Sequence, residues 1–414
     1  MTTSTKLKPS VLCTTVYLNN NPPKADTIDC MFDSTTLARF EGLETPFYYY
    51  DLALLGKTLE TCKSAADKYG FHVHYAFKAN FDEKVLQAIQ ALGFGADCVS
   101  GNEVKKAIEI GFDPEKVVFA GVGKSDKEII EALNKNIYCF NVESVQELGV
   151  INALAANLGK TARVAIRINP NVDAHTHHYI TTGLEENKFG VNQWELKACI
   201  EELQRSENLK LIGIHFHIGS QITKLEIFRS LCVKANELSQ WFEDHGFQLQ
   251  ILNVGGGLGV DYHNPDDAAI NDFASYFEVF DKFLERKPGQ QVHFELGRAL
   301  VAQCGNLISR ILYVKNGLKK NFIILDAGMT ELMRPALYQA YHKIENLSAD
   351  KRSDKIKYDV VGPICESTDW LGKEVELPAS KRGDLVVLRT AGAYGQVMAS
   401  GYNLRDIVRS EYSE

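Results

Sequence analysis

Residues 71–80 read FHVHYAFKAN, an aromatic and β-branched run that ends in a lysine and an asparagine. A short run of this composition, closed by polar residues, predicts a buried β-strand, here Phe71–Lys78. Seven further runs of the same kind follow along the chain. They are Gly95–Ser100, Lys116–Val122, Ile137–Val142, Arg163–Asn169, Leu211–Ser220, Ile251–Gly257 and Gln291–Arg298.

Segments with helical periodicity separate these runs. They are Asp82–Leu92, Glu103–Ile110, Asp126–Asn134, Val145–Leu158, Gln193–Gln204, Leu225–His245 and Asp272–Arg286. Eight strands that alternate with helices predict an α/β protein built on a (β/α)₈ barrel of the TIM type. A doubly wound open sheet gives the same alternation and remains the structural alternative.

Polar residues or glycines stand at the carboxyl end of nearly every predicted strand. In chain order they are Lys78 and Asn80, Asp97 and Ser100, Gly121, Asn141, Arg167 and Asn169, His215 to Ser220, Gly255 to Gly257, and Glu295 to Arg298. Active sites of barrel enzymes collect at this face. The ring of polar residues therefore favours the barrel and indicates where its functional site lies.

After Arg298 the alternation ends, and strand-like runs follow without regular helices. These runs are Leu307–Val314, Phe322–Asp326, Tyr358–Ile364 and Leu385–Thr390. They predict a β domain. The first 45 residues also lack helical periodicity, and Val11–Leu18 could pair into the same sheet. We therefore expect a barrel domain over 46–303 and a β domain made of 1–45 and 304–414.

The composition is that of a globular protein, with 45% hydrophobic and 24% charged residues among 414. A net charge of −8 argues against a nucleic-acid surface. No run approaches the roughly 20 apolar residues of a membrane helix, and the N-terminus lacks the apolar core of a signal peptide. Nine cysteines without CxxC spacing indicate reduced thiols and a cytoplasmic protein.

Lys78 stands directly after an apolar strand, which is an unusual place for a solvated charge. One interpretation is a strand-end lysine that reaches water. The other is a lysine that forms a Schiff base, because its amine becomes nucleophilic when desolvation or a nearby cation lowers its pKa.

Residues 213–221, GIHFHIGSQ, place His215 and His217 on one face of a strand. They could bind zinc, lie in the core, or set a flat ring beside a planar cofactor. Residues 253–260, NVGGGLGV, let the backbone approach an anion closely. Val260 takes the place of the last glycine in a dinucleotide fingerprint, so a single phosphate is the better expectation.

Glu295 lies on an apolar strand in HFELGR, residues 293–298, and a buried carboxylate needs a cationic partner. That partner is either Arg298 or the protonated nitrogen of a pyridine ring. Beyond the barrel, Cys365 and Glu366 follow a Gly-Pro turn. Arg334 and Tyr338 are four residues apart, so one helical turn could present both to a ligand.

Taken together, YAFKAN, FHIGSQ, GGGLG, ELGR, GPICES and AGAYG resemble the fold-type III pyridoxal-phosphate decarboxylases, from about residue 45 to the last strands. Two stretches, residues 167–190 and RPALYQAYH at 334–342, are typical of one subfamily, whose substrate carries an amino-acid head at its far end. A proline common in the family is replaced by Leu296, which removes no functional group.

The resemblance implies a Schiff base between Lys78 and pyridoxal phosphate, a ring contact from His217, and a bond from Glu295 to the pyridine nitrogen. Its further cofactor-binding residues would be Asp97, Ser220, Gly256, Gly257, Gly297, Arg298 and Tyr394. Its substrate-binding residues would be Arg298, Arg334, Tyr338, Glu366 and Tyr394. Cys365 would be the catalytic acid.

The resemblance also implies a homodimer in which Cys365 and Glu366 enter the site of the second subunit. Apart from the second subunit, the expected partner is a small amino-acid substrate. We expect no nucleic acid, membrane or metal. A decarboxylase of carboxynorspermidine or another basic amino acid is the alternative within the family. Outside it, a metal-dependent barrel hydrolase would use His215 and His217, with His175 and His177.

Overall fold

The computed structural model describes residues 31–172, 188–350 and 352–413. The chain divides into two units, residues 1–43 and 44–414. The first unit contains helix α1 (Ser34–Glu41), whose start is capped by the side chain of Asp33. The expectation that the first 45 residues lack a helix was wrong, because eight residues are too few to show a clear periodicity. The expected strand Val11–Leu18 lies outside the described residues.

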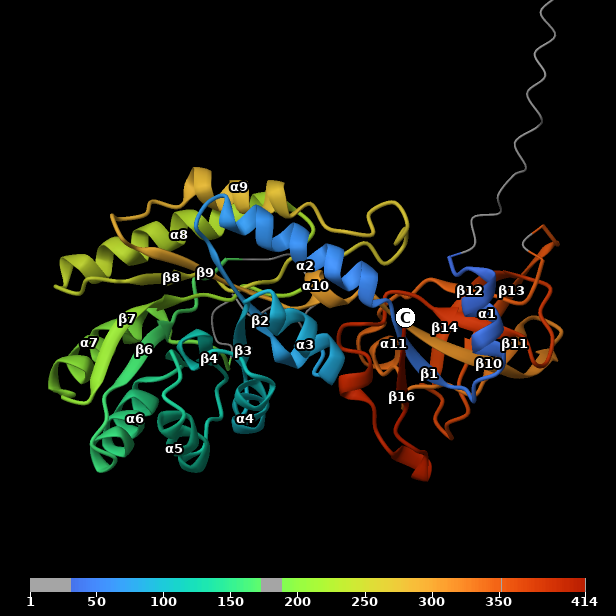
Figure 1. Ribbon diagram of the computed structural model, residues 1–414, viewed down its shortest axis with the longest axis horizontal. Coiled ribbons are helices and arrows are strands. Elements are labelled where there is room, and N and C mark those ends of the chain that lie inside the picture. The colour runs from blue at the N-terminus through green and yellow to red at the C-terminus, as the bar shows by residue number, and fades with distance from the viewer. Residues whose placement is uncertain (1–30, 173–187, 351, 414) are drawn as a thin grey trace, which may run out of the picture. The chain divides into compact units, whose positions relative to one another are not determined.

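In the second unit, eight parallel strands close into a barrel (Figure 1). They are β2 (His72–Ala76), β3 (Gly95–Cys98), β4 (Val117–Phe119), β5 (Cys139–Val142), β6 (Ala162–Arg167), β7 (Leu209–His215), β8 (Ile251–Asn253) and β9 (Gln291–Leu296). The barrel closes where β2 pairs with β9, for example at His74 and Glu295. The predicted barrel and its eight strands are confirmed, and the open-sheet alternative is wrong.

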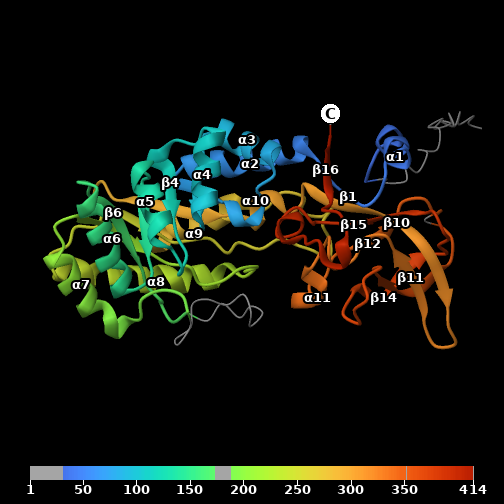
Figure 2. The same cartoon turned by 90° about the horizontal axis from the view of Figure 1, so that it is seen from below.

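Helices cover the outside of the barrel; α2 precedes its first strand, and the others follow barrel strands (Figures 1 and 2). They are α2 (Leu52–Asp67), α3 (Glu83–Ala91), α4 (Gly101–Ile110), α5 (Asp126–Asn134), α6 (Val145–Asn157), α7 (Leu196–Arg205), α8 (Leu225–Asp244), α9 (Phe273–Phe283) and the short α10 (Arg298–Val301). Serine N-caps begin α4, α5 and α6. At α5, Ser125 and Glu128 form a complete capping box, which satisfies backbone donors that the helix start leaves unpaired.

A second, mostly antiparallel sheet has the order β12-β15-β10-β11-β13-β14, with β1 pairing to β10 and β16. Its strands are β1 (Phe47–Tyr50), β10 (Gly305–Asn316), β11 (Asn321–Leu325), β12 (Ile344–Asn346), β13 (Lys355–Val361), β14 (Trp370–Pro378), β15 (Leu385–Leu388) and β16 (Arg409–Tyr412). Helix α11 (Arg334–Tyr338) lies between β11 and β12. The β domain is thus confirmed as a fold, while its borders at 45/46 and 303/304 stay a prediction.

Hydrogen bonds connect the end of β2 to this second sheet. The amide of Asn80 donates to the hydroxyl of Tyr50 at 3.0 Å and to the carbonyl of Gly392 at 2.8 Å. The backbone N–H of Tyr394 donates to the carbonyl of Ala79 at 2.8 Å. The turn that carries Lys78 is therefore held by both parts of the fold. Among the described residues, no helix has the length and apolar character needed to cross a membrane.

Candidate active site

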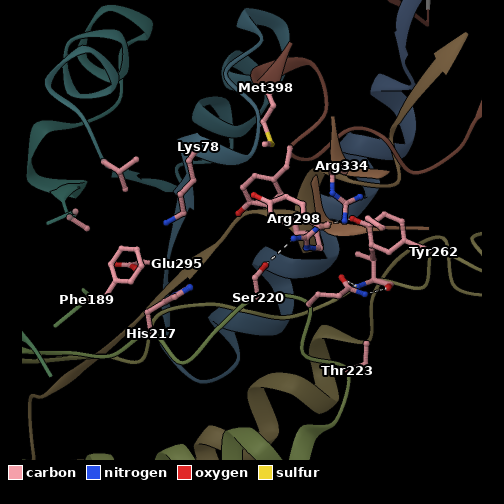
Figure 3. Close-up of a pocket in the computed structure, with 18 of the residues that line it drawn as sticks. Lys78, Phe189, His217, Ser220, Thr223, Tyr262, Glu295, Arg298, Arg334 and Met398 are labelled. Carbon is pink, nitrogen blue, oxygen red and sulfur yellow. Dashed lines mark hydrogen bonds between the residues drawn. The ribbon is translucent and has the colours of Figure 1, made fainter. Parts of the chain in front are cut away.

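A cavity of about 890 Å³ opens at the carboxyl ends of the barrel strands (Figure 3). Side chains from β9, from the loop after β7, from α11 and from the loop after β15 line it together. Eight of the predicted site residues are among its lining residues: Lys78, His217, Ser220, Glu295, Arg298, Arg334, Tyr338 and Tyr394. Six others are not: Asp97, Gly256, Gly257, Gly297, Cys365 and Glu366.

Lys78 lies in a short 3₁₀ turn, Phe77–Ala79, directly after β2. Its Nζ is 3.3 Å from Oδ2 of Asp97, whose side chain is fully buried. Burial alone would lower the pKa of Lys78, but attraction to Asp97, Tyr394 and Glu295 outweighs it and raises that pKa. The buried carboxylate that faces the amine thus raises the pKa of Lys78, whereas a nearby cation would lower it.

The carboxylate of Glu295 is 4% exposed and accepts three hydrogen bonds inside the barrel. Oε1 accepts from the amides of Asn141 at 2.9 Å and Asn253 at 2.7 Å, and Oε2 faces Nε2 of His215 at 3.0 Å. Burial would raise the pKa of Glu295, but the charge and hydrogen bond of His215 outweigh burial and lower it. Glu295 therefore stays ionised.

Arg298 is not the ionic partner that one interpretation assigned to Glu295. Its Nη1 donates to the hydroxyl of Tyr262 at 2.6 Å and its Nη2 to Oγ of Ser220 at 3.0 Å. In the part of the chain that the structure describes, Arg298 makes no ion pair with a carboxylate. Arg298 begins α10 two residues beyond the end of β9, and its side chain reaches Ser220 in the loop after β7 instead.

His217 lines the cavity and has a pKa well below its usual value, because of burial and of the charges of Lys78 and Arg167. It is therefore neutral, and Gly256 lies close enough for its N–H to donate to Nδ1 at 3.5 Å. Within the described ranges, no cluster of three metal-ligating side chains occurs. The metal-dependent hydrolase is thus not supported, and His175 and His177 lie outside the described residues.

The glycine loop after β8 lies tightly against its neighbours. Gly255 and Gly257 have positive φ angles of 68° and 103°. A Cβ on Gly256 would lie 1.8 Å from the carbonyl oxygen of Glu295. Glycines at these positions therefore allow the backbone to pass between β7 and β9 where no side chain fits.

Arg334 and Arg298 bring two buried positive charges to the cavity, each 6% exposed. The guanidinium carbon of Arg334 is 4.6 Å from the ring centre of Tyr262, and that of Arg298 is 4.8 Å from the ring centre of Tyr394. Nη1 of Arg334 is 2.7 Å from Nε2 of His342. Neither arginine forms an ion pair with a carboxylate of the described residues. This region of the cavity can therefore receive an anion.

Cys365 and Glu366 are exposed and do not reach the cavity of their own chain. The backbone N–H of Cys365 donates to Asn403 Oδ1 at 3.2 Å. The carboxylate of Glu366 accepts from the hydroxyl of Tyr402 at 2.7 Å. Both side chains therefore stand on an outer surface of the chain.

Sequence reasoning missed several side chains that build the site. Asn253 and His342 lay inside quoted motifs but received no role, although Asn253 closes a predicted strand and His342 ends the motif that begins with Arg334. Tyr262 lies in a loop after the glycine run, and no pattern in the sequence pointed to it.

Comparison with known proteins agrees with this geometry. The family described as "Pyridoxal-dependent decarboxylase, pyridoxal binding domain" matches residues 55–302. A diaminopimelate decarboxylase of Bacteroides thetaiotaomicron is 53% identical over 377 residues, which cover 91% of this chain and 97% of that protein. A diaminopimelate decarboxylase of Aquifex aeolicus is 41% identical, and the match covers 87% of this chain and 84% of that protein.

A solved structure of a diaminopimelate decarboxylase is also similar to this chain. The crystal structure of diaminopimelate decarboxylase from Helicobacter pylori, in complex with L-lysine, superposes with a TM-score of 0.85. Its sequence is 38% identical, and the match covers 92% of this chain and 94% of that one.

Proposed function

Because the chain belongs to the pyridoxal-dependent decarboxylases, among the diaminopimelate decarboxylases, we propose that it converts meso-diaminopimelate to L-lysine and carbon dioxide. Its cofactor is pyridoxal 5′-phosphate. The observation that carries the proposal is a single cavity lined by a lysine, a carboxylate and two arginines without carboxylate partners in the described residues. Figure 3 shows Lys78 and Glu295 toward one side of this pocket and Arg334 toward the other.

The residues present fit this cofactor. Buried polar atoms without a hydrogen-bond partner in the described structure include Oδ1 of Asp97, Nδ1 of His215 and Nε of Arg298. The backbone of Gly256 passes where a Cβ would collide with Glu295. A polar ring with an attached phosphate would give such donors and acceptors their partners, since buried polar groups are normally hydrogen-bonded.

When bound, the cofactor supplies an electron-accepting ring that takes up the electron pair left by departing carbon dioxide. Lys78 would hold the cofactor covalently, and the neutral ring of His217 would lie against it. Glu295, kept ionised by its neighbours, would hold a proton on the pyridine nitrogen. The phosphate would be bound by residues from four loops: Ser220, Gly256, Gly257, Gly297, Arg298 and Tyr394.

The far end of the substrate would be bound by Arg298, Arg334 and Tyr338, which offer two cations and a hydroxyl to a carboxylate. Ornithine and arginine have no carboxylate at that end, and so would leave the buried charge of Arg334 without an anionic partner. By fixing the far end, these residues would orient the near carboxylate for departure. The substrate class thus follows from charge.

We propose a homodimer in which Cys365, as the acid, and Glu366, as a partner for the distal ammonium, serve the second subunit. Their exposure and distance from their own cavity support this arrangement. The predicted cytoplasmic location is also kept as a proposal. It is supported by the seven cysteines of the described residues, all of them free thiols.

The test is release of carbon dioxide and lysine from meso-diaminopimelate by the purified protein with cofactor. Ornithine, arginine and carboxynorspermidine serve as competing substrates. We expect the protein to decarboxylate diaminopimelate at a much higher rate than any of these three compounds. Faster turnover of a substrate without a distal carboxylate would overturn it.

A further inference from the structure

His342 is a buried histidine whose two ring nitrogens both have partners. It is 2% exposed and lies between α11 and β12. Its Nδ1 is 2.8 Å from the carbonyl oxygen of Arg389, and its Nε2 is 2.7 Å from Nη1 of Arg334. A carbonyl can only accept, and a guanidinium can only donate. His342 therefore donates from Nδ1 and accepts at Nε2, which only the neutral ring in one tautomer can do.

The surroundings keep this ring neutral. Burial, followed by the charges of Arg334 and Arg298, lowers the pKa of His342 to about 3. The ring of Tyr262 packs edge-on against the ring of His342, with 5.2 Å between the ring centres. No carboxylate among the described residues bonds to His342 or Arg334, so the acceptor that holds this arginine carries no charge.

A neutral acceptor differs from a carboxylate in what it leaves available. A carboxylate would orient Arg334 and also cancel much of its charge, which would weaken attraction to an anionic ligand. An imidazole nitrogen orients the guanidinium through one N–H and leaves the positive charge and the other N–H groups for that ligand. The ring of Tyr262 at 4.6 Å supports the same guanidinium from another direction.

We propose that His342 is a positioning residue for substrate recognition, which directs Arg334 toward the distal carboxylate while leaving its charge uncompensated. This inference rests on the proposed function, which places that carboxylate at Arg334. His342 acts through Arg334 and is not itself in the reaction.

Three substitutions separate the parts of this role. In His342→Gln, the amide oxygen lies about where Nε2 was, and so keeps a neutral acceptor for Arg334. In His342→Glu, the side chain has the same shape as in His342→Gln but carries a negative charge. In His342→Asn, the shorter amide can still donate to Arg389 but offers no acceptor at the Nε2 position. The exposed His245, directly after α8, changed to Asn, controls for the loss of a histidine elsewhere.

The measurement is the affinity of each holoenzyme for L-lysine, which keeps the distal amino-acid head, and for cadaverine, which lacks its carboxylate. Calorimetry gives both without turnover. We expect both His342→Asn and His342→Glu to weaken lysine binding roughly ten-fold or more. The Asn variant loses a hydrogen bond to a charged group, whereas in the Glu variant the carboxylate offsets the charge of Arg334. His342→Gln should stay within a few-fold of wild type. Cadaverine binding should not change, and KM for diaminopimelate should rise far more than kcat falls.

Equal lysine affinity in the Gln and Asn variants, or equal losses for lysine and cadaverine, would overturn the inference and leave His342 with a packing role. A wild-type protein that neither decarboxylates diaminopimelate nor binds lysine would overturn the proposed function itself. If the Asn variant does not fold, ¹⁵N spectra of the histidine-labelled wild-type protein still test the inference. The signal of His342 is identified as the one that is missing in the Gln variant. They should show His342 neutral with its proton on Nδ1, and a proton on Nε2 would contradict the inference.

Discussion

Nζ of Lys78 lies 3.3 Å from Oδ2 of Asp97, a carboxylate with no access to solvent. The pair links the ends of the neighbouring strands β2 and β3. Burial and repulsion from Glu295 raise the pKa of Asp97 to about 6, against the attraction of Lys78. The amine and this carboxylate therefore influence each other's protonation.

Changing Asp97 to Asn removes the main attraction that raises the pKa of Lys78. Burial then dominates, and the pKa of the amine should fall. We expect the rate of covalent cofactor attachment to the apoprotein to reach its maximum at lower pH than in wild type. Borohydride trapping across a pH series measures this, and an unchanged profile would show that Asp97 does not control the amine.

Lys78→Ala should abolish decarboxylation and covalent attachment of the cofactor, because no other lysine lines the cavity among the described residues. Borohydride reduction of the wild-type holoenzyme, followed by peptide mass spectrometry, should find the label on the peptide that contains Lys78. Label on a different lysine would refute the assignment. Lys84→Ala, an exposed lysine on α3, is the matched control and should keep its label.

Glu295→Gln should keep the cofactor bound and lower kcat. An uncharged amide stabilises a protonated pyridine nitrogen poorly, and a preorganised partner of this kind is worth roughly 10²–10³-fold in rate. Cofactor content and steady-state kinetics measure the two effects separately. A wild-type kcat in the variant would reduce Glu295 to a structural partner of His215.

Mixing inactive Lys78→Ala and Cys365→Ala proteins should restore activity if Cys365 serves the second subunit. Half of the randomly exchanged dimers are mixed, and each mixed dimer has one intact site. We therefore expect about a quarter of wild-type activity from counting sites in a symmetric dimer. Exchange is checked with differently tagged chains. A mixture that stays inactive despite complete exchange would place both residues in the site of one chain.

Acid should destabilise the protein through His74, which is 3% exposed. Its Nδ1 donates to the carbonyl of Lys116 at 3.0 Å, and its Nε2 lies 2.8 Å from Nδ1 of His293. Burial lowers the pKa of His74 to about 4 from 6.5. The unfolded chain therefore binds a proton first, and the free energy of unfolding falls as the pH drops from about 6.5 to about 4.

Urea unfolding at pH 7 and pH 5 measures this loss. His74→Asn keeps a donor for Lys116 and cannot take up a proton. We expect the variant to be less stable than wild type at pH 7 but to lose less on acidification. Equal losses in both proteins would assign the acid sensitivity to other groups.

The barrel was predictable because its strands are apolar runs that end in polar residues. The helices between them have their own period, and most begin with a side-chain N-cap such as Asp82 or Ser100. The strand ends were less so. The predicted strand Phe71–Lys78 is too long at its end, since the strand stops at Ala76 and a 3₁₀ turn carries Lys78. The sequence has no separate signal for this turn. Short strands such as β12 and β16 have three or four residues, too few to form a pattern.

Residue types of the site were visible in the sequence, but their partners were not. Glu295 was expected to need a cation, and Arg298 is close in sequence. The donors that hold it instead come from β5, β7 and β8, which the closed barrel brings to one level. Contacts between residues so far apart in sequence depend on the strand register, which a single sequence does not reveal.

The hydrogen bonds that join Asn80 to Gly392 and Ala79 to Tyr394 also set an order of events during synthesis. The ribosome makes the lysine turn early, and the strands of the barrel are complete well before residues 392–394 leave the exit tunnel. A chain that ends with the last barrel strand lacks the partners that anchor this turn. The lysine turn can therefore take its final hydrogen bonds only after the C-terminal segment has been made.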